Sequence, residues 1–238
     1  MSLVRGCELT AARWPDVEAG PRRLLVVPLG SLEQHGPHLP LDTDTRIASA
    51  VASRACAGRR GVAVAPPVAI GASGEHADFP GTLSIGTEAL ALLLVELGRH
   101  ASLHWPAMLL VNGHGGNVPA ITRALGRLRA EGRRCDAWHA SLDGDPGDAD
   151  AHAGRFETSV MLALAPDQVR VAAAAPGERR PLAEIMPALL AGGVRSVSPN
   201  GVLGDPSGAS AAEGARLLDR LVAGLDKTLD ELLAGGES

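Results

Sequence analysis

The stretch that decides the fold is RLLVVPLGSLEQHGPHLPLDTD, residues 23–44. Its first part, 23–30, is a short apolar run that ends in Pro and Gly, as expected of a buried strand. The remainder is a loop dense in His, Asp and Glu. A segment with helical spacing of its apolar residues then starts at Thr45 and stops at a glycine. The stretch predicts a strand, a polar loop and a helix, in that order.

The same order recurs along the chain. Strand-like and helix-like segments alternate at 62–70, 87–104, 107–117, 118–132 and 135–140. Strands that alternate with helices imply a mostly parallel sheet with helices on its faces. We therefore expect a single three-layer α/β/α domain that covers residues 1–238.

The last third of the chain is less regular. Residues 155–165 predict a short helix that ends before a proline, and a long amphipathic helix starts at Ser210, with Glu213 placed as in a capping box. Between them, 172–210 is rich in Ala, Pro and Gly, and we expect an irregular segment that covers the site. The acidic segment 143–150 could be a mobile lid, but a solvated loop is favoured.

Composition excludes several kinds of partner. The net charge of −5 and the absence of clustered Lys and Arg argue against nucleic acid. No apolar run has the length of a signal-peptide core or a membrane span, so we expect a soluble, cytoplasmic protein with no membrane partner. The three cysteines are far apart and form no Cys-x-x-Cys pair, which argues against a disulfide framework and against a thiolate metal site.

The polar loop has the composition of a metal site. Glu33, His35, His38, Asp42 and Asp44 fall within a dozen residues and offer imidazole and carboxylate ligands, a set that suits zinc, iron or manganese. The glycine and prolines between them fix a folded loop. Because His and Asp are also common in solvated turns, density alone leaves both readings open.

Two later segments add chemistry-bearing residues. NGHGGN, residues 112–117, places His114 in a glycine loop after a strand, at the same carboxyl edge of the sheet as the first loop. HAGRFETS supplies His152 and Glu157. Alone, the first could be a glycine-rich turn around a buried His. Spacing alone favours ordinary helix-start residues for the second.

Taken together, GSLEQHGPHLPLDTD, NGHGGN and HAGRFETS, in this order, resemble the signature segments of the creatininase family, over roughly residues 25–160. The resemblance implies one α/β domain, a centre of two divalent metal ions, hydrolysis of C–N bonds in linear or cyclic amides, and a homo-oligomer. Mixed His and carboxylate ligands accept Zn, Fe(II) or Mn, so the sequence does not identify the metal.

Carried over by position, the resemblance puts Glu33 and His114 on one metal and His35 on the other, with Asp44 as a bridge. In the members that hydrolyse creatinine, a glutamate ligand stands where this chain has Gly116. Glu157 is the candidate replacement for that ligand.

The resemblance also bears on the substrate. Creatinine-hydrolysing members carry a Trp where this chain has Asp148, which argues against creatinine. The motifs are most similar to a branch of peptidases that release a C-terminal Val-Tyr dipeptide from a modified precursor peptide. One alternative is hydrolysis of a small formamide or cyclic amide in deazaflavin or riboflavin pathways. A second is a non-catalytic metal-bound scaffold, against which the intact ligands argue.

In either enzymatic reading, two cations lower the pKa of a water molecule and polarise the scissile carbonyl. His152 is then the expected general acid for the leaving nitrogen, with Glu157 also in the catalytic set. The loop Gly115, Gly116 and Asn117 offers N–H groups to the oxyanion. Glu75 and His76, in the segment GASGEHADFPGT, are the expected further substrate contacts. The chain has no G-x-S-x-G elbow and no H-E-x-x-H motif, so serine hydrolases and zincins are poor alternatives.

Overall fold

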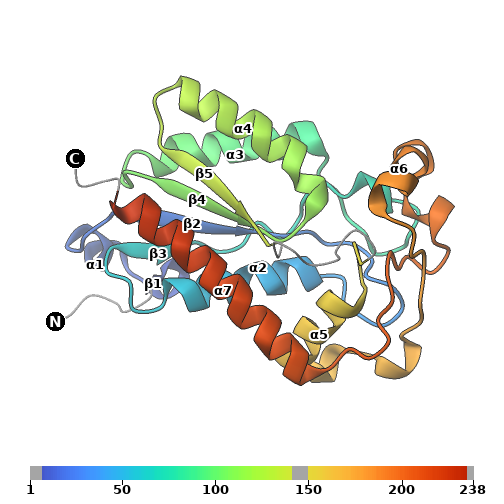
Figure 1. The fold of residues 1–238 in the computed structure, drawn as a ribbon. Helices are drawn as coiled ribbons and strands as arrows, with labels where there is room; N and C mark the ends of the chain where they lie inside the picture. The colour runs from blue at the N-terminus through green and yellow to red at the C-terminus, as the bar shows by residue number, and fades with distance from the viewer. Residues whose placement is uncertain (1–6, 141–149, 235–238) are drawn as a thin grey trace.

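A computed structural model of the chain describes residues 7–140 and 150–234. Its centre is a five-stranded, fully parallel sheet in the order β1-β3-β2-β4-β5 (Figure 1). The strands are β1 (Cys7–Glu8), β2 (Leu24–Leu29), β3 (Val62–Val64), β4 (Met108–Asn112) and β5 (Cys135–His139). The expected parallel sheet is confirmed, and the two-residue edge strand β1 is an addition to it.

Helices occupy both faces of this sheet, as expected. The α-helices are α1 (Trp14–Glu18), α2 (Thr43–Cys56), α3 (Thr87–Ala101), α4 (Val118–Ala130), α5 (Arg155–Leu164), α6 (Leu182–Val197) and α7 (Ala211–Ala234). Short 3₁₀ helices lie at η1 (Leu9–Ala11), η2 (Gly74–His76), η3 (Gly115–Asn117), η5 (Pro166–Gln168) and η6 (Val171–Ala173). Among the described residues, no helix is long and apolar enough to span a membrane.

The alternation of side chains along β2 creates the two cores. Leu24 and Val26 point to one face of the sheet, and Leu25, Val27 and Leu29 point to the other. All are buried. A strand whose every residue is apolar must be covered on both sides, and this explains why the sheet is the middle layer.

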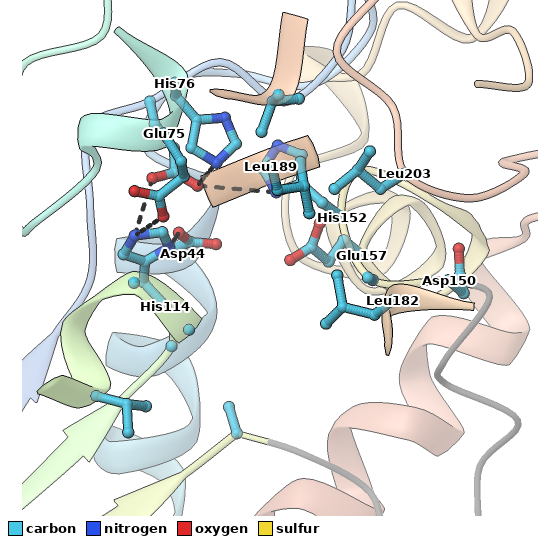
Figure 2. Close-up of a pocket in the computed structure, with 18 of the residues that line it drawn as sticks. Asp44, Glu75, His76, His114, Asp150, His152, Glu157, Leu182, Leu189 and Leu203 are labelled. Carbon is cyan, nitrogen blue, oxygen red and sulfur yellow. Dashed lines mark ion pairs between the residues drawn. The ribbon is translucent and has the colours of Figure 1, made fainter. Parts of the chain in front are cut away.

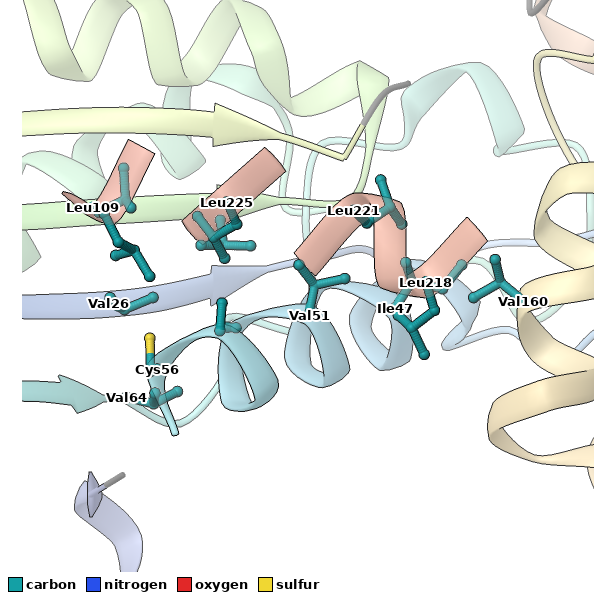
Figure 3. Close-up of a cluster of buried hydrophobic side chains, with 14 of the residues drawn as sticks. Val26, Ile47, Val51, Cys56, Val64, Leu109, Val160, Leu218, Leu221 and Leu225 are labelled. Carbon is teal, nitrogen blue, oxygen red and sulfur yellow. The ribbon is translucent and has the colours of Figure 1, made fainter. Parts of the chain in front are cut away.

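The first core lies between the sheet and helices α2, α5 and α7 (Figure 3). Val51 of α2, Leu221 and Leu225 of α7 and Val26 of β2 belong to this cluster, and all four are fully buried. Burial of each such side chain stabilises the fold by about 1.5–3 kcal/mol. Helices α3 and α4 cover the opposite face of the sheet (Figure 1).

Two predicted boundaries were wrong in detail. Helix α2 begins at Thr43, two residues earlier than the expected Thr45, so Asp44 lies in its first turn and not in the preceding loop. The predicted strand at 62–70 is reduced to Val62–Val64, because the prolines that follow cannot donate to a strand ladder.

The expectation of an irregular segment at 172–210 was also wrong, because helix α6 lies within it. Pro187 and Gly193 lower the helical propensity, and the helix is kinked at Gly193. Tertiary packing overrides this propensity: Ile185 and Val194 form a small core with Leu203. Residues of α6 line a cavity at the carboxyl edge of the sheet, as expected of a segment that covers the site.

The start of α7 is close to the expectation. The Ser210 hydroxyl accepts a hydrogen bond from the Glu213 N–H, as a cap should. The Glu213 carboxylate, however, binds Arg155 and the Ser159 hydroxyl, which ties α7 to α5. Residues 143–149 of the acidic segment, Asp148 among them, lie outside the described residues. The role of this segment as a loop or a lid therefore stays a prediction.

Candidate metal centre

The carboxyl ends of β2 and β4 deliver the predicted ligands to one place. Glu33 and His35 follow β2, Asp44 lies in the first turn of α2, and His114 follows β4. All four side chains are buried. In a parallel sheet these strand ends share one edge, so loops far apart in sequence converge there.

Asp44 lies between two histidines. Its Oδ1 is 2.9 Å from His35 Nε2, and its Oδ2 is 3.3 Å from His114 Nδ1. His114 in turn lies 3.2 Å, through Nε2, from Glu33 Oε2. Ligand atoms of Glu33, His35 and Asp44 all lie within 4.8 Å of one another. This is the arrangement expected of a carboxylate that bridges two ions.

Backbone carbonyls orient the two histidines. His35 donates its Nδ1–H to the Glu33 carbonyl at 3.1 Å, which leaves Nε2 facing Asp44. His114 donates its Nε2–H to the Ala72 carbonyl at 3.1 Å, which leaves Nδ1 facing Asp44. Such outer hydrogen bonds are how proteins fix the tautomer of a metal-ligating histidine.

Glu157 reaches the same cluster from α5. Its Oε2 lies 3.9 Å from His35 Nε2, and ligand atoms of His35, His152 and Glu157 lie within 4.8 Å of one another. The same oxygen accepts a hydrogen bond from the Ala153 N–H at 2.6 Å. Glu157 is therefore close enough to serve the ion that His35 would hold.

The glycine at 116 is explained by space. A Cβ there would lie 2.4 Å from both Glu75 Oε1 and His114 Nε2. Nothing larger than glycine fits without displacing these groups, so a glutamate ligand could not be accommodated at this position in the present arrangement. Glu157 approaches from the other side of the cluster.

The charged groups of the cluster shift one another's pKa values. Burial would lower the pKa of His35, but the nearby Asp44 carboxylate outweighs it and raises that pKa to about 10. Burial would likewise lower the pKa of His114, yet Glu33 and Asp44 raise it well above its usual value. Burial raises the pKa of Glu157 to about 7. Before any cation binds, protons on His35 and His114 balance the carboxylates.

His76 and His152 behave differently. Burial, helped by the neighbouring His152, lowers the pKa of His76 to about 4. Burial, helped by His35, lowers the pKa of His152 to about 3. Both rings are therefore neutral at neutral pH. Glu33 Oε1 lies 3.3 Å from His76 Nε2 and 3.7 Å from His152 Nδ1.

The residues present fit a divalent metal ion. Glu33 is fully buried, and neither of its carboxylate oxygens has a hydrogen-bond partner. An unsatisfied buried group costs about 1–3 kcal/mol, and more when it is charged. A cation would supply the missing partner, and imidazole nitrogens with carboxylate oxygens suit Zn, Fe(II) or Mn.

The expected substrate contacts are placed unequally. Glu75, His76, Gly115 and Gly116 line a cavity of about 1450 Å³ beside the cluster. Asn117 does not line it: its side chain is buried, accepts the Ala72 N–H and donates to the Gly30 carbonyl. Asn117 therefore holds the loops together, and its assignment as a substrate contact stays a prediction.

Figure 2 shows Glu75, His76 and His114 on one side of the cavity and His152 and Glu157 on the other. Further cavity residues escaped the sequence analysis. They include apolar side chains of α6 and its surroundings and one arginine of α7: Leu182, Met186, Leu189, Leu190, Val194, Leu203 and Arg220. An amphipathic reading of 182–197 would have found the first group.

Two buried polar residues near the ligands were also missed. Ser31 donates its hydroxyl to Asp44 Oδ2 at 2.7 Å. Gln34 stands between Glu33 and His35 in the sequence and contacts both His76 and His152. The serine hydroxyl and the glutamine amide carry no charge near neutral pH and are not typical metal ligands. A search of the sequence for charged ligands therefore does not identify them.

Comparison with known proteins agrees with this geometry. Residues 10–229 match the family model described as creatinine amidohydrolase. The mycofactocin precursor peptide peptidase of Mycolicibacterium smegmatis is 54% identical over 206 residues, which are 84% of this chain and 82% of that protein.

Solved creatininases share the fold. A mutant creatininase of the Zn–Zn type aligns with a TM-score of 0.74 and 27% identity, covering 94% of this chain and 96% of that one. A creatininase whose title names Mn aligns with a TM-score of 0.72 and 26% identity, covering 95% and 98%.

Proposed function

The chain belongs to the creatininase family, and we propose that it is a metal-dependent peptidase that releases the C-terminal Val-Tyr dipeptide from the modified mycofactocin precursor peptide. The family and the identity to a peptidase of that name support a hydrolase of C–N bonds. The observation that carries the proposal is the buried cluster of Glu33, His35, Asp44 and His114, in which both oxygens of the Glu33 carboxylate lack a hydrogen-bond partner.

We assign Glu33, Asp44 and His114 to one ion and His35, Asp44 and Glu157 to the other. Two divalent cations held there would supply a water of lowered pKa and polarise the carbonyl of the scissile peptide bond. The chain's own residues hold the ions, exclude bulk water and move protons.

We assign His152 to move the proton of the attacking water. Its Nε2–H donates to the Gln34 carbonyl at 2.7 Å, so the Nδ1 lone pair faces the cluster. Because the pKa of His152 is lowered to about 3 by burial, the ring is neutral at the start of the reaction. It can act as an acid only after Nδ1 has accepted a proton from water. That proton then goes to the leaving amine nitrogen as the C–N bond breaks.

The cavity favours a peptide over a small ring. Its volume of about 1450 Å³ exceeds the ~300–1,000 Å³ typical of small-molecule sites. Leu182, Leu189 and Leu203 give it an apolar wall opposite Glu75 and His114 (Figure 2). Such a wall suits the apolar valine and the ring of tyrosine, whereas a creatinine-sized molecule would contact little of it.

A peptidase that releases a C-terminal dipeptide must also bind the terminal carboxylate of its substrate. Two arginines line the cavity. Arg155 is engaged by Glu213, but Arg220 is exposed and makes no ion pair with any described residue. We assign Arg220 as the partner of the substrate's carboxylate, since a guanidinium matches that group in two hydrogen bonds.

The test is to incubate metal-loaded protein with the modified precursor peptide and to follow dipeptide release by mass spectrometry. We expect one dipeptide to be released from each precursor peptide, and we expect a chelator or Glu33→Gln to abolish this release. Hydrolysis of a formamide or cyclic amide without peptide cleavage would favour the small-amide alternative. A metal-loaded protein that cleaves neither would favour a non-catalytic scaffold.

Three further expectations remain proposals. One is that residues 1–238 form a single domain, for which limited proteolysis should yield no stable half. The second is a homo-oligomer, which light scattering on the purified protein would detect. The third is a cytoplasmic location, which cell fractionation would check.

A further inference from the structure

Gln34 is a buried residue with an unusual position in the site. It lies between Glu33 and His35 in the sequence and is only 5% exposed. Its side-chain amide and its backbone carbonyl contact two histidines that line the cavity, His76 and His152. It is neither a ligand nor a titrating group, so its part in the site must come from hydrogen bonding.

Two backbone groups fix which way the amide points. The Gly36 N–H donates to the side-chain Oε1 at 2.8 Å, and Nε2 donates to the Gly201 carbonyl at 2.9 Å. A flipped amide would set N–H against N–H and oxygen against oxygen, so only this orientation is compatible with both contacts. One of the two hydrogens on Nε2 is therefore committed to Gly201.

The backbone carbonyl of Gln34 then fixes His152. His152 Nε2 lies 2.7 Å from that oxygen, a distance that requires a hydrogen on Nε2. The 3.1 Å approach of the same nitrogen to the amide Nε2 consequently brings two donors together and is not a hydrogen bond. The second amide hydrogen is left for His76 Nδ1, 2.9 Å away.

Both neutral rings therefore carry their proton on Nε2, but they turn different nitrogens toward Glu33. In His76, Nδ1 accepts from Gln34, so the proton is on Nε2, which faces Glu33 at 3.3 Å. In His152, Nε2 carries the proton, and the Nδ1 lone pair faces Glu33 at 3.7 Å. Gln34 thus leaves the Nε2–H donor of His76 and the Nδ1 acceptor of His152 facing the same side of the site.

We propose that Gln34 is a positioning residue that locks His76 as an Nε2–H donor and His152 as an Nδ1 acceptor toward the reacting group. This inference rests on the proposed hydrolase function. A protonated Nε2 has no lone pair for a metal, so His76 does not ligate an ion, although its ring nitrogen lies near Glu33 and His152. Instead, the His76 N–H is available to the oxygen of the scissile carbonyl as negative charge develops on it.

The first readout is the tautomer itself. Protein labelled with ¹⁵N-histidine, both without metal and with zinc, is studied by long-range ¹H–¹⁵N correlation at pH 7.5. We expect an unprotonated Nδ1 on His76 and a protonated Nε2 on His152. In Gln34→Glu the side chain cannot donate, so His76 Nδ1 should become protonated. In Gln34→Met, which offers neither group, His76 should lose its single tautomer.

The second readout is kinetic. Loss of one oxyanion donor costs on the order of 10²–10³ in kcat, so both Gln34 variants should lose roughly 100-fold in kcat on the peptide. The KM should change little, and metal content should equal that of the wild type. Gln168→Glu and Gln168→Met, at an exposed position outside the site, serve as matched controls and should change none of these quantities.

Several results would overturn the inference. They are a protonated Nδ1 on His76 in the wild type, unchanged tautomers in Gln34→Glu, or full kcat in both variants. A loss of activity that simply follows loss of metal would also reject it, since that is a structural effect. The tautomers are read without turnover, so absence of peptide cleavage in the wild type would count against the proposed function and leave the tautomer measurement intact.

Discussion

Replacing Glu33 with Gln should affect the protein in opposite ways with and without metal. In the structure neither carboxylate oxygen accepts a hydrogen bond, and Asp44 and Glu157 place two further carboxylates in the same cluster. Without metal, the amide loses no hydrogen bond; it gives up the ion pair with His114, 3.2 Å away, but it also relieves the repulsion from the two other carboxylates. The free energy of unfolding in chelator should change by less than about 1 kcal/mol, roughly the worth of one hydrogen bond.

With metal the balance reverses. An ion present at 100 times its Kd stabilises the native wild type by about 2.7 kcal/mol. At about 2–4 °C per kcal/mol for a chain of this size, the Tm should rise by roughly 5–11 °C. If loss of the charged ligand weakens binding about 100-fold, as even outer-shell changes can, the same ion concentration gives about 0.4 kcal/mol. The variant should then gain less than about 2 °C.

The assay is thermal unfolding followed by circular dichroism, on chelated protein and after addition of Zn, Mn or Fe(II). Glu18→Gln, an exposed carboxylate on α1, is the control and should keep the full rise. An equal metal-dependent rise in Glu33→Gln and wild type would refute the assignment of Glu33 as a ligand. So would a destabilisation of the chelated variant by more than about 2 kcal/mol, because that would mean that Glu33 has a structural partner.

Three other perturbations have defined outcomes. Arg220→Met should raise KM for the peptide at least 10-fold, about 1.4 kcal/mol, but should leave KM for a C-terminally amidated peptide unchanged. Arg216→Met, on the same helix, should change neither KM. An equal effect of Arg220→Met on both peptides would reject carboxylate binding. The pKa of His35 is raised to about 10, and a ligand must be neutral to bind, so metal binding at pH 7.5 should release at least one proton per chain and should tighten as pH rises. Calorimetry in two buffers of different ionisation enthalpy measures the released protons, and a binding heat that is the same in both buffers would contradict the prediction. Leu221→Ala, in the core between α2 and α7, should lower the free energy of unfolding in urea by about 2–5 kcal/mol. The exposed control Leu103→Ala should lower it by less than about 0.5 kcal/mol. A similarly small loss for Leu221→Ala would contradict the burial of this side chain.

Much of the fold could be predicted because its signals are local. The apolar run at 23–30 and the strand-then-glycine pattern at 107–117 each specify a strand and the loop at its carboxyl end. Parallel pairing of such strands brings their loops to one edge, so Glu33 and His114 could be expected together although they lie far apart in the chain. Here the physics of the sheet supplies the long-range information.

Other features could not be predicted because they depend on tertiary contacts. Helix α6 contains a proline and a glycine and is stabilised by packing on Leu203, which local propensity does not reveal. His76 was expected only as a substrate contact, but it lies 3.3 Å from Glu33, inside the cluster. Gln34 carries no charge, and its hydrogen bonds to Gly201 and His152 come from distant parts of the chain.

The most direct measurement of the central claim is a metal titration of activity. Metal-free protein receives increasing Zn or Mn, and the rate of dipeptide release from the modified precursor peptide is measured after each addition. The account predicts no release before the first addition and a rate that levels off at two ions per chain. Release by rigorously metal-free protein, or a rate that does not respond to any of the ions, would contradict it.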